Sequence, residues 1–170
     1  EVSEVVSGVL AELATPAEEA GIVLQAAPLS PCQVVCAPGV LASLISNLAR
    51  NAIEHMDDRS CARAERRVTV QVQPGRERVR VEVDDTGPGV PRGWEELIFQ
   101  PYLRGPDSRR TGVGLGLATV KRLVEAHAGT VGIAPSPSGG ARFWFELPRA
   151  PEAKPPARVR RETPVELRIG

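Results

Sequence analysis

The stretch RVRVEVDDTGPG, residues 78–89, joins two sequence patterns. Its first half places Val79, Val81 and Val83 alternately with charged residues, a spacing that is typical of a strand with one buried face. Its second half, TGPG, consists of residues that favour turns. The stretch therefore predicts a strand that ends in a tight turn directly after two aspartates.

The second of these aspartates, Asp85, has the same parity as the valines, so its carboxylate is expected to face the buried side. Such a placement is costly unless a donor satisfies the carboxylate. An adenine amino group would do so, and Gly87 and Gly89 would let the backbone lie close against a flat ring. The alternative is an ordinary Asp turn after a strand. Asp84 has the opposite parity and is expected in solvent.

Regular patterns extend on both sides of this strand. A second alternating run at 68–72, followed by Pro74-Gly75, predicts a hairpin with it. The segment 87–111 is rich in Gly, Pro and Arg and predicts a long loop, with one or two helical turns at 94–99. Helical or alternating spacing predicts helices from Val2 to a stop at Gly21, from Pro38-Gly39 to about Met56 and from Leu115 to His127, and strands over 22–26, 130–134 and 141–147.

The composition indicates one globular domain. The chain has 170 residues, of which 42% are hydrophobic and 25% charged, and no apolar run approaches the roughly 20 residues that span a bilayer. The 21 Lys and Arg balance 21 Asp and Glu, so a general electrostatic attraction to nucleic acid is not indicated. The chain begins at Glu1 without an initiating Met, which favours a piece of a longer protein.

The three cysteines, Cys32, Cys36 and Cys61, lack the spacing of a disulfide framework or a zinc site, and we expect reduced thiols. Beyond Pro148 the chain is rich in Pro and carries six basic against three acidic residues. We therefore divide the chain into a domain over 1–148 and a linker-like tail over 149–170. Docking of 165–169 as a short strand, or on a partner, is the alternative for the tail.

The helix that ends near Met56 contains SNLARNAIEH, residues 46–55. Its Asn47, Asn51 and His55 are spaced by four and form one stripe at the edge of the apolar arc. A carboxamide oxygen in this place could ligate Mg²⁺, which prefers oxygen ligands. Alternatively, the asparagines are surface residues or bond to a neighbouring loop.

The third informative stretch is TGVGLGLA, residues 111–118. Gly112, Gly114 and Gly116 precede a predicted helix, so exposed N–H groups and the positive end of the helix dipole would suit a polyphosphate. The spacing matches neither the Walker pattern nor the dinucleotide fingerprint. A flexible loop before a helix is the alternative.

In their order and spacing these pieces closely resemble the ATP-binding catalytic domain of sensor histidine kinases, in the superfamily shared with gyrase, the MutL proteins and large heat-shock chaperones. The resemblance covers residues 2–148 and follows the family's boxes in order. The matching residues are Asn47 and Asn51 in the N box, Asp85, Gly87 and Gly89 in the first glycine box, Phe99 and Tyr102 in the F box, and Gly112, Gly114 and Gly116 in the second glycine box.

The resemblance implies a two-layer α/β sandwich, in which helices cover one face of a mixed sheet and nucleotide lies between the helices and a lid over about 103–110. It implies ATP and Mg²⁺ as cofactors, with Asn51 and Asn47 at the metal. The residues implied in nucleotide binding are Asn47, Asn51, His55, Asp85, Gly87, Gly89, Tyr102, Gly112, Gly114, Leu115 and Gly116. His55 could instead support the asparagine stripe, and Tyr102 could be a core or hinge anchor.

Phosphoryl transfer is assigned to Asn51 together with lid arginines, because Arg and Mg²⁺ stabilise the charge on a transferring phosphoryl group. Arg109 and Arg110 are the candidates, with Arg104 beside them, and a solvated basic loop is the alternative. The resemblance implies that superfamily members that hydrolyse ATP carry a Glu-x-x-x-Asn pattern, in which the Glu is the general base for water. In this chain the position of that Glu holds Asn47. This favours transfer to an external acceptor. A departure is Glu54, where the family often has Lys.

The resemblance implies a two-component kinase module whose partners are an upstream dimerisation domain with the acceptor His and a response-regulator receiver domain. It implies a cytoplasmic domain without contacts to nucleic acid or membrane, in a homodimeric parent that could be membrane-anchored. Glu54 and the absent acceptor motivate an alternative, a nucleotide-binding regulatory module that no longer transfers phosphate. Plain ATP hydrolysis is a third, weaker interpretation.

Overall fold

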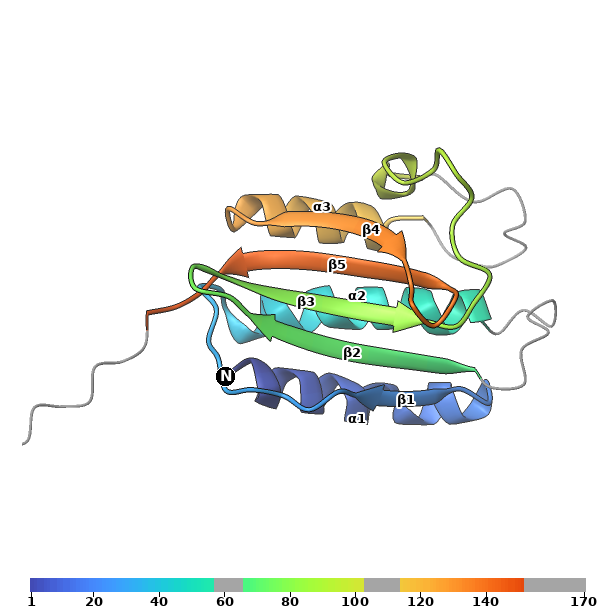
Figure 1. The fold of residues 1–170 in the computed structure, drawn as a ribbon, viewed down its shortest axis with the longest axis horizontal. Helices are drawn as coiled ribbons and strands as arrows, with labels where there is room; N and C mark the ends of the chain where they lie inside the picture. The colour runs from blue at the N-terminus through green and yellow to red at the C-terminus, as the bar shows by residue number, and fades with distance from the viewer. Residues whose placement is uncertain (57–65, 103–113, 152–170) are drawn as a thin grey trace, which may run out of the picture.

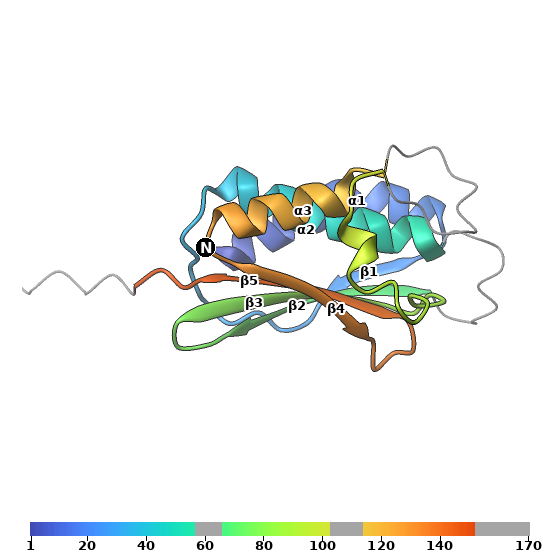
Figure 2. The ribbon, with the colours of Figure 1, turned by 90° about the horizontal axis from the view of Figure 1, so that it is seen from above.

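A computed structural model describes residues 1–56, 66–102 and 114–151. These residues form a five-stranded sheet in the order β1-β2-β3-β5-β4, with helices on one of its faces (Figures 1 and 2). The strands are β1 Val23–Ala26, β2 Arg67–Pro74, β3 Arg78–Asp85, β4 Thr130–Pro135 and β5 Ala141–Pro148. The helices are α1 Val2–Glu19, α2 Pro38–Met56, α3 Gly116–Ala126 and the short 3-10 helix η1 Leu97–Phe99. The expected two-layer α/β sandwich with a mixed sheet is confirmed.

The sheet is mixed because its first strand runs parallel to the second, whereas the other pairs are antiparallel. The predicted hairpin is confirmed as β2 and β3, with Val70 opposite Val83. On its other side β3 pairs with β5, where Val83 lies opposite Phe143. The strand that carries the two aspartates therefore lies at the centre of the sheet.

The core lies between the sheet and the helices. The inward valines of β2 and β3 and the inward aromatic residues of β5 pack against α2, whose apolar residues recur at helical spacing. The fully buried side chains include Leu13, Leu44, Ile45, Leu48, Met56, Val68, Val70, Val79, Phe145 and Leu147. None of the helices within the described ranges is both long and apolar enough to cross a bilayer.

The opposite face of the sheet carries polar side chains, and there the expectation for Asp84 is wrong. Asp84 is only 3% exposed. Arg142 of β5 donates to both carboxylate oxygens at 2.8 Å, and Gln71 of β2 donates at 2.9 Å. Long side chains of the two neighbouring strands thus cover and satisfy the carboxylate, which strand parity by itself does not reveal.

The same network continues along the polar face. Glu82 is 3% exposed and forms ion pairs with Arg80 at 3.0 Å and Arg142 at 3.1 Å. The Arg80 guanidinium also lies 3.9 Å from the centre of the Trp144 ring, within range of a cation-π contact. This face is therefore held by paired charges rather than by a second layer of helices.

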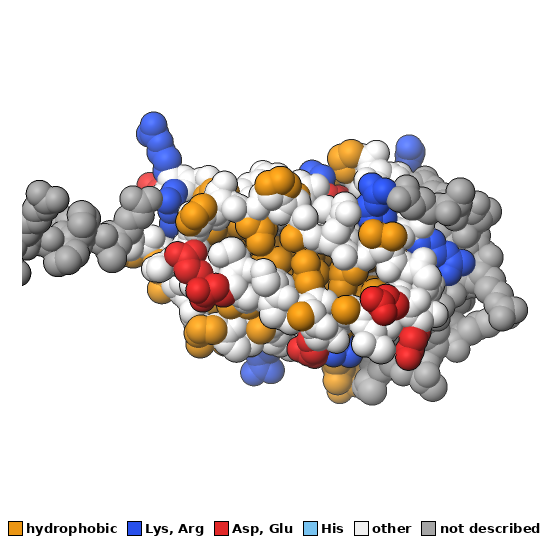
Figure 3. Space-filling model, turned by 90° about the horizontal axis from the view of Figure 1, so that it is seen from below, with side chains coloured by type: hydrophobic (Ala, Val, Ile, Leu, Met, Phe, Trp, Pro, Cys, Tyr) orange, Lys and Arg blue, Asp and Glu red, His pale blue; other side chains and the backbone are white. Residues whose placement is uncertain are grey.

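The short strand β1 forms one edge of the sheet. Figure 3 views the molecule from the side that carries this edge and shows apolar side chains along the middle, with charged side chains around them. Val23 of β1 is 48% exposed. Short edge strands offer little backbone for unwanted pairing with other chains.

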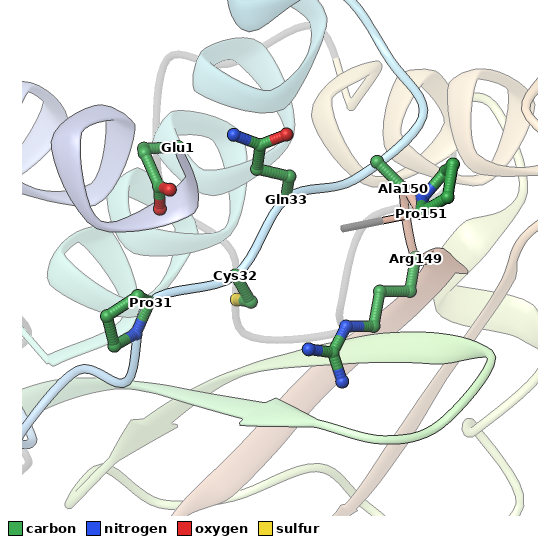
Figure 4. Close-up of a pocket in the computed structure, with 7 residues that line it drawn as sticks. All are labelled: Glu1, Pro31, Cys32, Gln33, Arg149, Ala150 and Pro151. Atoms are coloured by element: carbon green, nitrogen blue, oxygen red, sulfur yellow. The ribbon is translucent and has the colours of Figure 1, made fainter. Parts of the chain in front are cut away.

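The start and the described end of the chain both lie at the end of the molecule opposite the turn after β3 (Figure 1). Val34 bridges Arg149, and the Ala150 N–H donates to the Gln33 carbonyl at 2.9 Å, so sheet-like pairing continues past the expected boundary at 148. A cavity of about 330 Å³ lies here, with Cys32 in its wall (Figure 4). Cys32 and Cys36 are free thiols. Cys61 and the residues from 152 onward lie outside the described residues.

Candidate functional site

The predicted site residues that the structure describes gather at one end of the sandwich, on the right in Figure 1. There the end of β3, the C-terminal half of α2 and the start of α3 meet. A Cβ atom added to Gly116 of α3 would lie 3.3 Å from Asn47 Oδ1 of α2. A Cβ atom added to Gly87 would lie 3.1 Å from Met56 Cγ, at the end of α2. Three stretches far apart in the sequence are therefore in contact.

Asp85 is the buried acidic residue of this site, with an exposed fraction of 3%. Its Oδ1 accepts a hydrogen bond from the Gly87 N–H at 2.8 Å and another from the Ala141 N–H at 3.1 Å. Among the described residues no hydrogen bond ends on Oδ2. The carboxylate is thus fixed through one oxygen and retains acceptor capacity on the other.

Burial raises the pKa of Asp85, because the charged form loses its hydration. The N–H groups of Ala141 and Gly87 and the nearby charge of His55 act in the opposite direction. The charge of Asp84, at the preceding position of the strand, raises the pKa of Asp85 further. A partner that donates a hydrogen bond to the ionised carboxylate would offset the cost of burying it.

Glycines allow the backbone to pack tightly around this carboxylate. Gly87 is buried, and Gly89 has φ +78°, a conformation that glycine adopts without strain. A Cβ atom added to Gly89 would lie 3.5 Å from the Gly140 carbonyl oxygen. The loop after β3 therefore lies against the turn between β4 and β5.

Asn47, the first residue of the asparagine stripe of α2, lies against the start of α3. Asn47 donates from Nδ2 to the Ser43 carbonyl at 2.7 Å, which directs its Oδ1 toward Gly116. Asn51 is different, because its Nδ2 is buried and has no hydrogen-bond partner within the described part of the chain. A buried amide without a partner is costly, and a ligand that bonds it would remove that cost.

At the end of the stripe, His55 and Glu54 are exposed. His55 is close enough to Asp85 to lower the pKa of that carboxyl through its charge.

The start of α3 is open at its N-terminus. Leu115 precedes the helix with 40% of its surface exposed, and no side chain of the described residues caps this helix end. The N–H groups of a first helical turn have no partners within the helix and bind anions readily. Gly114, with φ +70°, leads the chain into this turn.

The aromatic residues of the predicted F box have different environments. Phe99 is 7% exposed and belongs to the core, whereas Tyr102 is 72% exposed. Tyr102 has φ +62°, and its N–H donates to the Gly114 carbonyl at 3.0 Å. The structure therefore places Phe99 as an anchor and joins Tyr102 to the start of α3 through the backbone.

Part of the predicted site falls on residues that the structure does not describe. Arg104, Arg109, Arg110 and Gly112, together with the lid expected over 103–110, lie in this part. Their assignments remain predictions.

The contacts of Asp85 also include a segment that the sequence analysis did not assign to the site. The Ala141 N–H bonds the carboxylate, and Gly140 packs against it. The only signal for this contact in the sequence is the SGG turn before a strand, and nothing in that pattern indicates which residue it meets in space.

Comparisons with known proteins give the family and the fold neighbours of the chain. Residues 37–151 match the family described as histidine kinase-, DNA gyrase B- and HSP90-like ATPase. The chain is 40% identical over 120 residues to the sensor protein KdpD of Mycobacterium tuberculosis strain H37Rv, an alignment that covers 69% of this chain and 13% of KdpD. It is 33% identical over 121 residues to the sensor-type histidine kinase PrrB of the same strain, with 71% and 26% covered.

Solved structures show the same likeness. The structure of full-length ShkA in complex with AMPPNP superposes with a TM-score of 0.76 at 31% identity, covering 91% of this chain and 31% of ShkA. The ATP-binding domain of PrrB from Mycobacterium tuberculosis superposes with a TM-score of 0.69 at 25% identity, covering 89% of this chain and 96% of that domain. The chain therefore corresponds to one part of longer relatives and to nearly all of an isolated domain.

Proposed function

Because the chain belongs to the histidine kinase-, DNA gyrase B- and HSP90-like ATPase family, we propose that it is the catalytic ATP-binding domain of a sensor histidine kinase. In this role it binds Mg-ATP and passes the γ-phosphoryl group to a histidine on an upstream dimerisation domain outside this chain. The observation that carries the proposal is the buried Asp85 carboxylate, which the described residues hold through Oδ1 and not Oδ2, together with the buried Asn51 Nδ2, which has no partner among those residues.

Asp85 is the proposed acceptor for the base. Its Oδ2 would accept a hydrogen bond from the 6-amino group of adenine, and the glycines at 87 and 89 would allow the ring to approach the backbone. A hydrogen bond to a charged acceptor in a buried site discriminates strongly against ligands that lack the donor. Asp85 would therefore select adenine among the purines.

The start of α3 and the asparagines of α2 are the proposed phosphate side of the site. The open N–H groups at Gly116 and Leu117 would bind phosphate oxygens. Within the described ranges no three His, Cys, Asp or Glu side chains cluster to hold a metal ion, so the ligands from the protein would be amide oxygens. Asn51, with Asn47 beside it, would hold Mg²⁺ in this way. When bound, the ion neutralises charge on the phosphoryl group in transfer.

The site favours transfer to a protein acceptor over transfer to water. Position 47, which would hold the general base of a hydrolase, is Asn, and an amide cannot take a proton from water. Arg109 and Arg110 are proposed to stabilise the charge on the phosphoryl group. The next acceptor would be an aspartate of a response-regulator receiver domain. We place the domain in the cytoplasm, in a parent that is a homodimer.

Titration calorimetry of the 170-residue chain with Mg²⁺ and a non-hydrolysable ATP analogue tests the binding site. Asp85→Asn and Asn51→Ala are expected to weaken binding roughly tenfold or more, because each removes a hydrogen bond or a ligand in a buried site. Arg50→Ala is the control on the same helix, since that side chain is exposed and pairs with Glu12. Unchanged affinity in Asp85→Asn would overturn the adenine assignment.

The kinase activity is tested on the full-length parent. Incubation with radiolabelled ATP is expected to yield a phosphoprotein that is labile in acid and stable in base, as phosphohistidine is. A parent that binds ATP but forms no phosphoprotein under any stimulus would instead be a nucleotide-binding regulatory module of the same fold.

A further inference from the structure

The turn between β4 and β5, residues 136–140, lies directly against the Asp85 carboxylate although more than fifty positions separate them in the sequence. Gly140 is buried at the point of contact. A Cβ atom added there would collide with Asp85 Oδ1, with the Asp85 carbonyl oxygen and with the Gly87 nitrogen. Two of these atoms belong to the backbone, so a side chain at position 140 cannot be accommodated by a change of rotamer.

The turn itself is held by local hydrogen bonds. The Ser136 N–H donates to the Gly140 carbonyl at 2.9 Å, and the Gly139 N–H donates to the Ser136 carbonyl at 2.8 Å. Ser136 Oγ accepts from the Ser138 N–H at 3.1 Å, and the side chain of Ser136 is buried. Gly140 is therefore presented to Asp85 by a turn with a defined shape.

The carboxylate is held from two sides. The Gly87 N–H approaches Oδ1 from the loop after β3, and the Ala141 N–H approaches the same oxygen from β5. A Cβ atom added to Gly89 would lie 3.5 Å from the Gly140 carbonyl oxygen. The loop after β3 and the β4–β5 turn are therefore in contact with each other. Both donors bond Oδ1, and no donor of the described residues bonds Oδ2, so Oδ2 can accept from a ligand.

We infer that Gly140 is a positioning residue for base recognition: by carrying no side chain it lets the β4–β5 turn hold Asp85 Oδ1, which reserves Oδ2 for a purine 6-amino group. The inference rests on the proposed function, because it names what makes the Asp85 site selective. It predicts that replacing Gly140 lowers the affinity for ATP but not the affinity for a nucleotide whose base lacks the 6-amino group.

The direction of the electrostatics agrees with this role. The N–H groups of Ala141 and Gly87 lower the pKa of Asp85, against the effect of burial. They therefore favour the ionised carboxylate, which can accept hydrogen bonds from the backbone on Oδ1 and from a ligand on Oδ2. A substitution that pushes the turn away would weaken the bond from Ala141 and leave the carboxylate less well oriented.

The test compares two ligands, ATP and purine riboside 5′-triphosphate, which carries hydrogen in place of the 6-amino group. Dissociation constants of the 170-residue chain with Mg²⁺ are measured by calorimetry for the wild type, Gly140→Ala and Ser136→Ala. Gly129→Ala is the matched control, because a Cβ there would also collide with a backbone oxygen, that of Glu146, but away from Asp85.

The wild type is expected to bind ATP roughly tenfold or more tightly than the analogue. Gly140→Ala is expected to lose this preference, with ATP affinity falling to that of the analogue while analogue affinity changes less than about twofold. Ser136→Ala is expected to shift the preference in the same direction by roughly threefold, since it removes one local hydrogen bond. Gly129→Ala should retain the preference of the wild type even if its thermal stability falls.

The outcomes separate the inference from the proposed function. A wild type without preference for ATP would overturn the role of Asp85 itself. A wild type that prefers ATP, with the preference intact in Gly140→Ala, would overturn only the inference about Gly140. If Gly140→Ala does not fold, Ser136→Ala decides, and an unchanged preference in that variant would overturn the inference as well.

Discussion

Asp84 and Asp85 are neighbours with identical side chains and opposite surroundings. Alternation along β3 directs Asp84 to the polar face of the sheet, where Arg142 and Gln71 satisfy it. It directs Asp85 to the helical side, where its hydrogen bonds within the described residues come from two backbone N–H groups. The first is neutralised by a paired cation, and the second keeps an oxygen available. Asp84 therefore stabilises the sheet, while Asp85 is suited to bind a ligand.

Asp85→Asn is expected to make the free chain more stable at neutral pH. Burial raises the pKa of Asp85 in the folded protein, so the folded state binds this proton more tightly than the unfolded chain does. The contribution of the carboxyl to stability is then full below its unfolded pKa and is lost as the pH rises through the folded pKa. The amide of Asn at position 85 cannot ionise, so the variant does not lose stability as the pH rises.

Urea unfolding of the wild type and Asp85→Asn over a range of pH measures this effect. The free energy of unfolding of the variant is expected to exceed that of the wild type near neutrality, and the difference is expected to shrink as the pH falls toward 3.8, the ordinary pKa of the carboxyl. A difference that does not change with pH would show that Asp85 is not the titrating group.

Arg142→Gln is expected to destabilise the protein by about 3 kcal/mol, because it leaves the buried carboxylates of Asp84 and Glu82 without their shared cation. Urea unfolding measures the loss. Arg76→Gln, at an exposed position of the β2–β3 turn, is the control and should cost less than about 0.5 kcal/mol. A loss of similar size in both variants would contradict the role of the network, whereas Asp84→Asn added to Arg142→Gln should recover part of the stability.

The alternation of Val79, Val81 and Val83 correctly predicted the side that Asp85 faces, because parity along a strand depends only on local geometry. It could not predict that Asp84 is buried, since the residue that covers it, Arg142, belongs to a strand 58 positions away. Gly140 was missed for the same reason. Both contacts depend on how β3 pairs with the distant strand β5. The local pattern of a single sequence does not reveal which residues of the two strands lie opposite each other.

At the scale of elements, α2 stabilises the fold with one face and lines the site with the other. Leu48→Ala, at a fully buried position, is expected to cost about 3 kcal/mol through lost burial and the cavity left behind. Arg50→Ala should cost less than about 1 kcal/mol, because its ion pair with Glu12 is 53% and 62% exposed. Thermal or urea unfolding of both variants measures the contrast, and equal losses would contradict the placement of α2.

The elements themselves were largely predictable. The long amphipathic patterns predicted α1, α2 and α3, and alternation predicted β2, β3 and β5, each within a few residues of its observed bounds. The one or two helical turns expected at 94–99 are confirmed as the short η1, and the Ile98 N–H also donates to the Trp94 carbonyl at 3.0 Å. The parallel pairing of β1 with β2 has no local signal, since it depends on the crossover through α2.

At the scale of the whole molecule, helices cover one face of the sheet and the site lies at the end where β3, α2 and α3 meet (Figure 1). In the proposed function this arrangement would bind a nucleotide, and Asn47 supplies no general base to activate water. The chain incubated with Mg-ATP is expected to release inorganic phosphate no faster than buffer does. Phosphate release that Asn51→Ala abolishes would show instead that the domain hydrolyses ATP.

The backbone bond between Tyr102 and Gly114 has a consequence for how this family can vary. It joins the two residues that flank 103–113, Tyr102 and Gly114, directly to each other. The positions of the flanking elements therefore do not depend on the number of residues between them. Doubling such a stretch costs only about 0.6 kcal/mol of closure entropy. Insertions and deletions are therefore expected to accumulate there among homologues, and a fluorescent reporter could be grafted at that point without disturbing α3.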